Sequence, residues 1–154
     1  MNHFLLLAFA IGFVAGLRSL VTPAMVSWAA QLGWLSLGGT PLSFMASPVA
    51  VGVFTVLAVL ELIADVLPKT PARTAPASLA VRVITGGLAG ACLSVANGGA
   101  LWIGVVLGIA GAMIGAYAGY YTRRGLVSRL RVQDILIAIP EDIIAIGLAY
   151  LIVR

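Results

Sequence analysis

Four ionisable residues lie within long apolar stretches of the sequence, where their chemistry would be unusual: Arg18, Glu61, Glu141 and Asp142. At membrane depth a charged side chain is costly unless it is paired, hydrated or able to reach the membrane surface. A buried carboxyl group can also keep its proton, because burial disfavours the charged form. We therefore expect each of the four to meet a counter-charge or a polar cavity.

Arg18 is followed closely by Ser19 and by Pro23, which interrupts helical hydrogen bonding. Pro23 has no N–H, so the carbonyl group of Ser19 would lose its partner in a helix. We expect a kink or a break near residues 18–23, and such breaks persist only where the backbone is buried in protein or lines a wet cavity. Arg18 would then contact an anion or a substrate. The alternative is a structural salt bridge, or a side chain that extends to the membrane surface.

Glu61 and Asp65 are four residues apart, which places them on one face of a helix. Asp65 is close enough to Lys69 to pair with it near the membrane surface, which predicts a structural role for Asp65. Glu61 lies one turn deeper and has no basic partner at that spacing. We expect it to pair with Arg18 or Arg82 from another helix, or to hold a proton.

Pro140 and the two acids that follow it, Glu141 and Asp142, are typical of a helix start. Proline suits the first helical position, and acids suit the first turn, where the helix dipole is positive. The competing interpretation is a break inside the last apolar stretch, with both acids lining a polar cavity. By rise per residue Glu141 and Glu61 lie at similar depths, so together they could bind a cation or share a proton.

The composition identifies the class of protein. Of 154 residues, 62% are hydrophobic and 9% are charged, against about 25% charged in ordinary soluble domains. The mean hydropathy is +1.13. A soluble protein could not cover its surface with so few polar groups, and a disordered chain needs the opposite balance. Cys92 is the single cysteine, so no disulfide forms within the chain. We expect one all-α transmembrane domain over residues 1–154.

Five apolar stretches approach or exceed the roughly 20 residues that a membrane-spanning helix needs. They cover residues 4–30, 48–67, 79–96, 101–121 and 134–153. The first is predicted to be broken, and the fifth is a candidate for a break. With five spans, the first two run opposite to the last two, which is the arrangement of an inverted repeat around a central helix.

Basic residues set the expected orientation in the membrane. Most of them lie in or beside the segments after the second and fourth spans: Lys69, Arg73, Arg82, Arg123, Arg124, Arg129 and Arg131. Short segments rich in lysine and arginine stay in the cytoplasm. We therefore expect a multi-pass protein of the bacterial inner membrane with a cytoplasmic N-terminus and the C-terminal Arg154 outside. The net charge of +4 is explained by contact with lipid headgroups, and no nucleic-acid partner is expected.

Glycines recur on three of the predicted spans, mostly four residues apart. They are Gly12, Gly16, Gly86, Gly90, Gly104, Gly108, Gly111, Gly115 and Gly119. Residues at this spacing share a helix face, and small residues there let helix backbones approach closely in lipid. The pattern predicts tight packing, within one chain or between chains. Five spans make a thin bundle, so we expect a homo-oligomer.

Known catalytic and metal-binding patterns are missing from the sequence. The single histidine, His3, is terminal, and there is no Cys/His cluster, phosphate-binding loop or nucleophile–base motif. We therefore expect no enzyme activity, no catalytic residue, no metal and no cofactor.

Several of these motifs together resemble a family of small bacterial membrane proteins classed as a domain of unknown function. The resemblance covers nearly the whole chain and rests on Gly16-Leu17-Arg18 with Pro23, Glu61-Leu-Ile-Ala-Asp65 with Pro68, Arg82 before Gly86-Gly87, Gly115 to Tyr120, and Glu141-Asp142. Pro140 departs from the pattern, in which a small residue is expected before the acids. A weaker resemblance links Gly115 to Arg124 with DedA-type lipid transporters. The first family implies an integral membrane protein without a settled activity.

Charged residues beside helix breaks in a glycine-packed bundle predict a small transporter or channel for a solute, a cation or protons. The expected pathway residues are Arg18, Ser19, Pro23, Glu61, Asp65, Arg82, Glu141 and Asp142. The alternative is a structural or assembly protein whose buried charges only form salt bridges. A lipid-modifying enzyme is a third possibility, but it would need a nucleophile or a metal set that we do not find.

Overall fold

The computed structural model describes residues 3–65, 74–130 and 135–154, which are helical apart from short connections. In chain order the elements are α1 (His3–Leu17), α2 (Val21–Gln31), the short 3₁₀ helix η1 (Ser43–Ala46), α3 (Pro48–Ala64), α4 (Pro76–Ala96), α5 (Leu101–Leu130) and α6 (Ile135–Val153). Within the described ranges the protein is all-α, as the sequence predicts.

Three helices are long and apolar enough to cross a membrane: Pro76–Ala96, Leu101–Arg129 and Leu136–Val153. Two shorter apolar helices accompany them, His3–Leu17 and Pro48–Ala64. With 15 and 17 residues, these reach roughly 22 and 26 Å at 1.5 Å per residue, less than the hydrocarbon core of about 30 Å. The chain is therefore a multi-pass membrane protein, and the expected number of five crossings stays a prediction.

The predicted first span is divided into two helices. It ends as α1 at Leu17 and resumes as α2 at Val21, which leaves residues 18–20 outside any helix. Pro23 is the third residue of α2, in the first turn, where a missing N–H costs no helical hydrogen bond. The break that Pro23 and the length of the stretch predict is thus confirmed.

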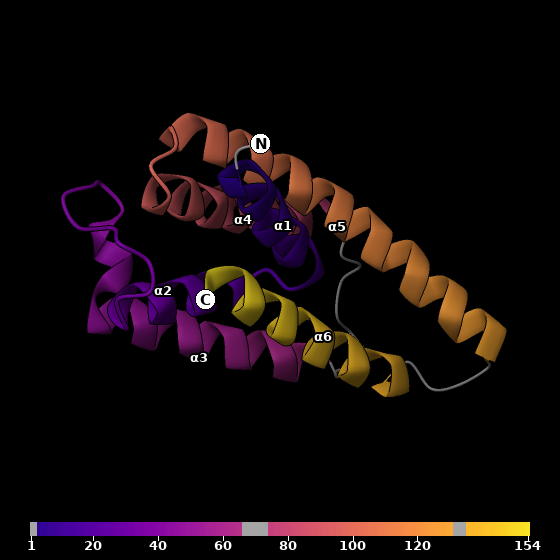
Figure 1. Ribbon diagram of the computed structural model, residues 1–154. Coiled ribbons are helices and arrows are strands. Elements are labelled where there is room, and N and C mark those ends of the chain that lie inside the picture. Colours follow the sequence, from indigo (N-terminus) through magenta and orange to yellow (C-terminus); the bar gives the residue numbers. More distant parts are fainter. Residues whose placement is uncertain (1–2, 66–73, 131–134) are drawn as a thin grey trace.

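The six α-helices form two groups (Figure 1). Helices α1, α4 and α5 pack together on one side, while α2, α3 and α6 lie on the other. Because the break redirects the chain, α1 belongs to the first group and α2 to the second. Helices α5 and α6 follow one another in sequence but diverge, and they touch little.

Glycines bring the backbones of the first group together. A Cβ atom added to Gly108 of α5 would collide with the carbonyl oxygen of Gly86 on α4, and one added to Gly12 of α1 would collide with that of Gly108. An added Cβ atom would collide with the backbone of a neighbouring helix at five further glycines: Gly16, Gly90, Gly104, Gly111 and Gly115. These contacts lie within one chain. Gly119 lies instead beside a groove between α5 and α6.

Two predicted helix boundaries are wrong. Pro140 does not start a helix, since α6 begins at Ile135 and runs through the proline without a break. Pro140 lies in the second turn, where it removes only one backbone hydrogen bond, a loss that membrane helices tolerate. Helix α5 continues to Leu130, although we expected it to end near Tyr121. No proline lies between Tyr121 and Leu130, and Gly125 alone does not end a helix.

Candidate functional site

The helix break is held at both ends by charged side chains from other helices. Glu61 on α3 accepts hydrogen bonds from the backbone N–H groups of Ser19 and Leu20, both at 2.8 Å, and from the Ser19 hydroxyl at 2.5 Å. Arg82 on α4 donates from Nη1 to the carbonyl oxygen of Gly16 at 2.7 Å. An anion thus meets the positive start of α2, and a cation meets the negative end of α1.

This capping role corrects the predicted partners of Glu61. We expected Glu61 to pair with Arg18 or Arg82, but its carboxylate binds the backbone ahead of α2 instead. The physical reason is the break itself. It exposes N–H groups that have no helical partner, and a carboxylate satisfies two of them at once.

Arg18 lies in the break, fully buried, and binds two carboxylates from different helices. Its Nη2 atom is 2.7 Å from Oδ2 of Asp65, the residue that follows α3, and also donates to Oδ1 of Asp142 on α6. The same Oδ2 of Asp65 accepts from Nη1 of Arg123 on α5 at 2.8 Å. That nitrogen lies 4.0 Å from Oε2 of Glu141. The five side chains form a network that joins the break to α3, α5 and α6.

The Arg18 guanidinium is not fully used by this network. Its Nε and Nη1 atoms are buried and have no hydrogen-bond partner among the described residues. A buried polar group without a partner loses hydration without compensation, which costs about 1–3 kcal/mol and more for a charged group. Arg18 therefore has donors that an additional acceptor would satisfy.

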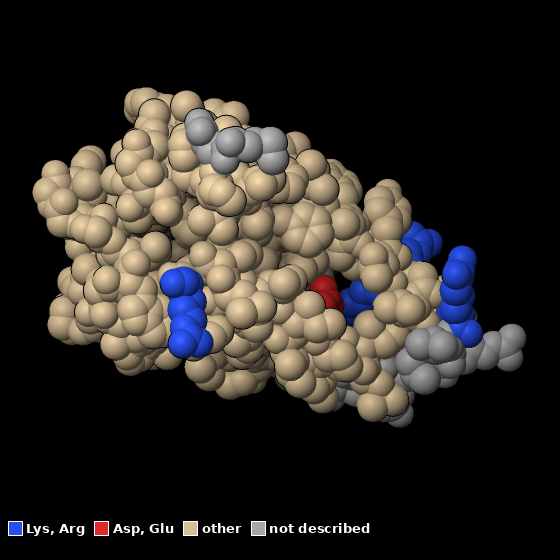
Figure 2. Space-filling model, viewed as in Figure 1, with Lys and Arg blue, Asp and Glu red and all other residues tan. Residues whose placement is uncertain are grey.

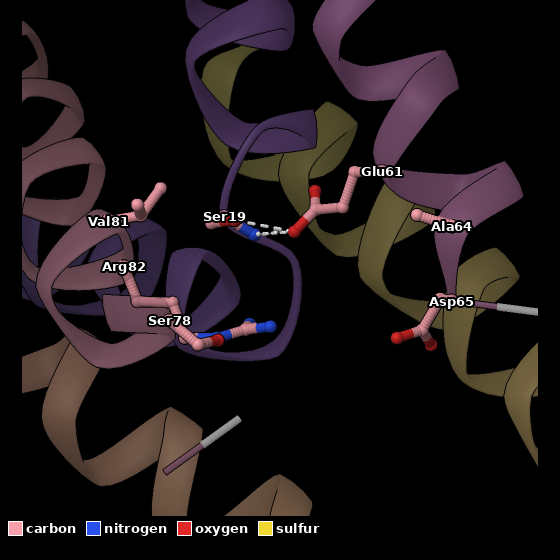
Figure 3. A pocket seen from close by; sticks show the side chains of 7 residues that line it. All are labelled: Ser19, Glu61, Ala64, Asp65, Ser78, Val81 and Arg82. Atoms are coloured by element: carbon pink, nitrogen blue, oxygen red, sulfur yellow. Dashed lines mark hydrogen bonds between the residues drawn. The ribbon is translucent and has the colours of Figure 1, made fainter. Parts of the chain in front are cut away.

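A cavity of about 180 Å³ lies beside the break. Figure 3 shows Glu61 and Asp65 projecting from α3 on one side, with Ser78 and Arg82 of α4 on the other. Ser19 lies between them. The lining carries both signs of charge together with hydroxyl groups. It is suited to a small polar molecule or an ion rather than to an apolar one.

The structure gathers most of the predicted pathway residues around the break: Arg18, Ser19, Glu61, Asp65, Arg82 and Asp142, with Glu141 at the edge of the network. Pro23 is buried in the first turn of α2. The expected pairing of Glu61 with Glu141 does not occur, because Glu61 caps α2 whereas Glu141 lies near Arg123 and lines a different hollow. Lys69, the expected partner of Asp65, lies outside the described residues.

The sequence reasoning missed Arg123 as a member of the network. It was assigned to a loop, whereas α5 continues through it. The spacing contains a usable signal, since Gly115, Gly119 and Arg123 are four residues apart and therefore share a helix face. Gly115 packs on Phe13 of α1. This helix face therefore places Arg123 near the C-terminal end of α1, where the break begins.

No group of three or more His, Cys, Asp or Glu side chains that could hold a metal ion occurs in residues 3–65, 74–130 and 135–154. Two arginines bind the central carboxylate of Asp65. These two arginines supply the positive charge that a bound cation would otherwise supply beside this carboxylate.

Comparisons with known proteins identify a family but no activity. The family described as "Domain of unknown function (DUF4126)" matches residues 5–154. No curated protein and no solved structure matches the chain. The match agrees with the first of the two resemblances seen in the sequence, and the similarity to DedA-type proteins stays a prediction.

Proposed function

Since the chain belongs to the DUF4126 family, a domain of unknown function, we propose its function from the geometry of the break. We propose a small membrane transporter or channel in which a solute or an ion binds between α1 and α2. The observation that carries this proposal is Arg18, which is fully buried at the break with two guanidinium nitrogens unpartnered among the described residues.

The broken helix supports this function physically. Unwound backbone is stable at membrane depth only where protein buries it or where it lines a cavity, and transporters use broken helices to build solute sites. Here Glu61 and Arg82 satisfy the two helix ends at the break. The break is therefore a persistent structure rather than a flexible kink.

The charges around the break support a small polar solute. Glu61, Asp65 and Arg82 line the cavity, and Arg18 lies behind Asp65, bound among the described residues through Nη2 only. A molecule with an acceptor group would use the spare donors of Arg18, and a cation or a proton would be held by the carboxylates. In this proposal the pathway passes Arg18, Ser19 and Glu61 and continues along Asp65, Arg82, Asp142 and Glu141.

The membrane orientation is part of the same proposal. Arg123, Arg124 and Arg129 all lie toward the C-terminal end of α5, which would place this end in the cytoplasm. Helix α1 runs parallel to α5, since Phe4 lies beside Gly99 and Phe13 beside Gly115. The N-terminus would therefore lie at the opposite, outer face, which corrects the cytoplasmic N-terminus expected from the sequence. The C-terminal Arg154 would then lie outside. We also propose that the protein lies in a bacterial inner membrane and forms a homo-oligomer.

Purified protein in liposomes tests it. We expect flux of at least one of three probes, namely protons, potassium and zwitterionic amino acids. Arg18→Gln and Glu61→Gln should each lower that flux about tenfold or more, since a hydrogen bond to a charged group is worth about 1.5–3 kcal/mol. Arg154→Gln is the control, because Arg154 is exposed and contacts Tyr150. Equal flux in all three variants would exclude the proposed pathway.

A structural or assembly role is the second candidate, and one observation favours it. Asp65 binds Arg18 in the break and Arg123 on α5, so the network ties the end of α3 to α5 and to the break. Under this alternative, replacing Arg18, Asp65 and Asp142 together by neutral residues of similar size would preserve both folding and cellular phenotype. Loss of phenotype in a folded triple variant would favour transport.

A further inference from the structure

A second groove lies between α5 and α6, and Glu141 is the one proposed pathway residue that lines it. Its volume is about 440 Å³, within the range of roughly 300–1,000 Å³ that ligand sites occupy. Most of its lining is apolar, including Phe13, Leu17, Leu126 and Ile144, whereas Arg123 and Glu141 are charged. The groove therefore combines a long apolar wall with a polar part.

The groove opens toward the surroundings of the helix bundle. Leu136 and Ile144 of α6 line it and remain 59% and 58% exposed, and Leu126 of α5 is 39% exposed. Figure 2 shows acidic and basic side chains at the bottom of a hollow in an otherwise mostly uncharged face. In a membrane this opening faces lipid, so an acyl chain can enter sideways without crossing a polar surface.

Charge identifies the headgroup that fits. Helix α5 carries three arginines near its C-terminal end and no acidic residue. Arg123 lines the groove, and the other two are Arg124 and Arg129. Arg129 is exposed and follows Thr122 by two helical turns on the face of α5 that lines the groove, whereas Arg124 lies on the other side of the helix. Arginine forks match phosphate oxygens in geometry as well as in charge.

We infer that the groove between α5 and α6 binds one anionic phospholipid, with an acyl chain along Leu126, Leu136 and Ile144 and the phosphate at the Arg129 end of this face of α5. This site is separate from the cavity at the break and does not depend on transport. It places a lipid against Glu141 and Arg123, the outer members of the charge network.

Photo-crosslinking in vesicles tests the inference. The probes are phosphatidylglycerol and phosphatidylcholine, each with a photoreactive acyl chain, and the labelled residues are mapped by mass spectrometry. Phosphatidylglycerol should label Leu126, Leu136 and Ile144 at least about fivefold more than Val106 and Met113, which are exposed on α5 outside the groove. That factor is the affinity that one arginine near the membrane surface contributes.

Matched variants separate the groove from general lipid contact. Thr122→Trp, at an exposed position of the lining, should fill the groove and remove its labels, while Val106→Trp should leave them. Leu136→Trp is a second filling variant, and size-exclusion chromatography confirms the fold of each. Arg129→Gln should weaken labelling by phosphatidylglycerol about fivefold and leave labelling by phosphatidylcholine unchanged, while Arg124→Gln, on the other side of α5, should change neither.

Three results would overturn the inference. They are even labelling around α5 and α6, equal labelling by the two lipids, and crosslinks from the groove to a second copy of the chain. None of them depends on flux, so the site and the proposed transport function can fail independently.

Discussion

Helices α1, α4 and α5 meet backbone to backbone, whereas α2, α3 and α6 join them through side chains, apolar ones in the shared core and charged ones at the break. In the first group Gly108 touches Gly86 and Gly12 so closely that no Cβ atom fits between the helices. At the boundary between the groups, Arg18 and Arg123 both bind Asp65. Close packing fixes one distance between helices, but long side chains can keep an ion pair over a range of positions.

The two kinds of helix contact both follow from the lipid that surrounds the helices. Lipid gives no hydrophobic drive for helices to associate, so contact must come from close packing or from polar bonds. The glycine group uses the first means and the charged boundary uses the second. Under the proposed transport function, this division would make α1, α4 and α5 the fixed part. Helices α2, α3 and α6 would then be the part that changes position around the break.

The largest predicted effect concerns the charged boundary. Arg18→Met should lower the free energy of unfolding by about 3–5 kcal/mol, because it leaves the carboxylates of Asp65 and Asp142 without their buried partner. Titration of the protein in micelles with a denaturing detergent measures the change. Adding Asp65→Asn and Asp142→Asn should restore most of the loss. A single variant as stable as the parent would show that the boundary is not held by charge.

The next effect concerns the glycine group. Gly108→Ala should lower the free energy of unfolding by about 1–3 kcal/mol, because the added methyl group meets backbone that cannot yield. Gly52→Ala on α3 is the matched control, since nothing lies within 4 Å of its added Cβ. The control should be neutral or stabilising by about 0.5–1 kcal/mol. Equal effects at the two glycines would contradict the contrast between the groups.

A smaller effect is expected at the cap of α2. Glu61→Gln should cost about 0.5–2 kcal/mol, because an amide keeps one acceptor oxygen but loses the charge that faces the helix N-terminus. The same detergent titration measures it, with Arg154→Gln as the exposed control. An unchanged free energy in Glu61→Gln would mean that the carboxylate charge does not hold the break.

Some of this arrangement could be predicted from the sequence because its cause is local. Pro23 and the length of the first apolar stretch predict the break, and glycines four residues apart predict a close-packed helix face. Arg18 could be singled out because a charge in an apolar stretch requires compensation. Each of these signals lies within a few residues along the chain.

The partners of the charges could not be predicted, because packing over long distances in sequence decides them. Glu61 binds backbone 41 and 42 residues away, and Arg18 meets Asp142, 124 residues away. Pro140 is a case in which a local sequence pattern gave a wrong prediction. Its local pattern is that of a helix start, but α6 continues through it, since tertiary packing overrides a local preference.

The most direct test asks whether water reaches the break. In a Cys92→Ala background, Ser19→Cys places a thiol in the cavity lining, and Ser94→Cys places one in the glycine group, where Ser94 is fully buried. A small membrane-impermeant thiol reagent is added to both faces of vesicles that contain each variant. If the break lines a solute pathway, the cysteine at position 19 reacts and the cysteine at position 94 does not. Two unreactive cysteines, in variants shown to be folded, would contradict a water-filled pathway at Arg18.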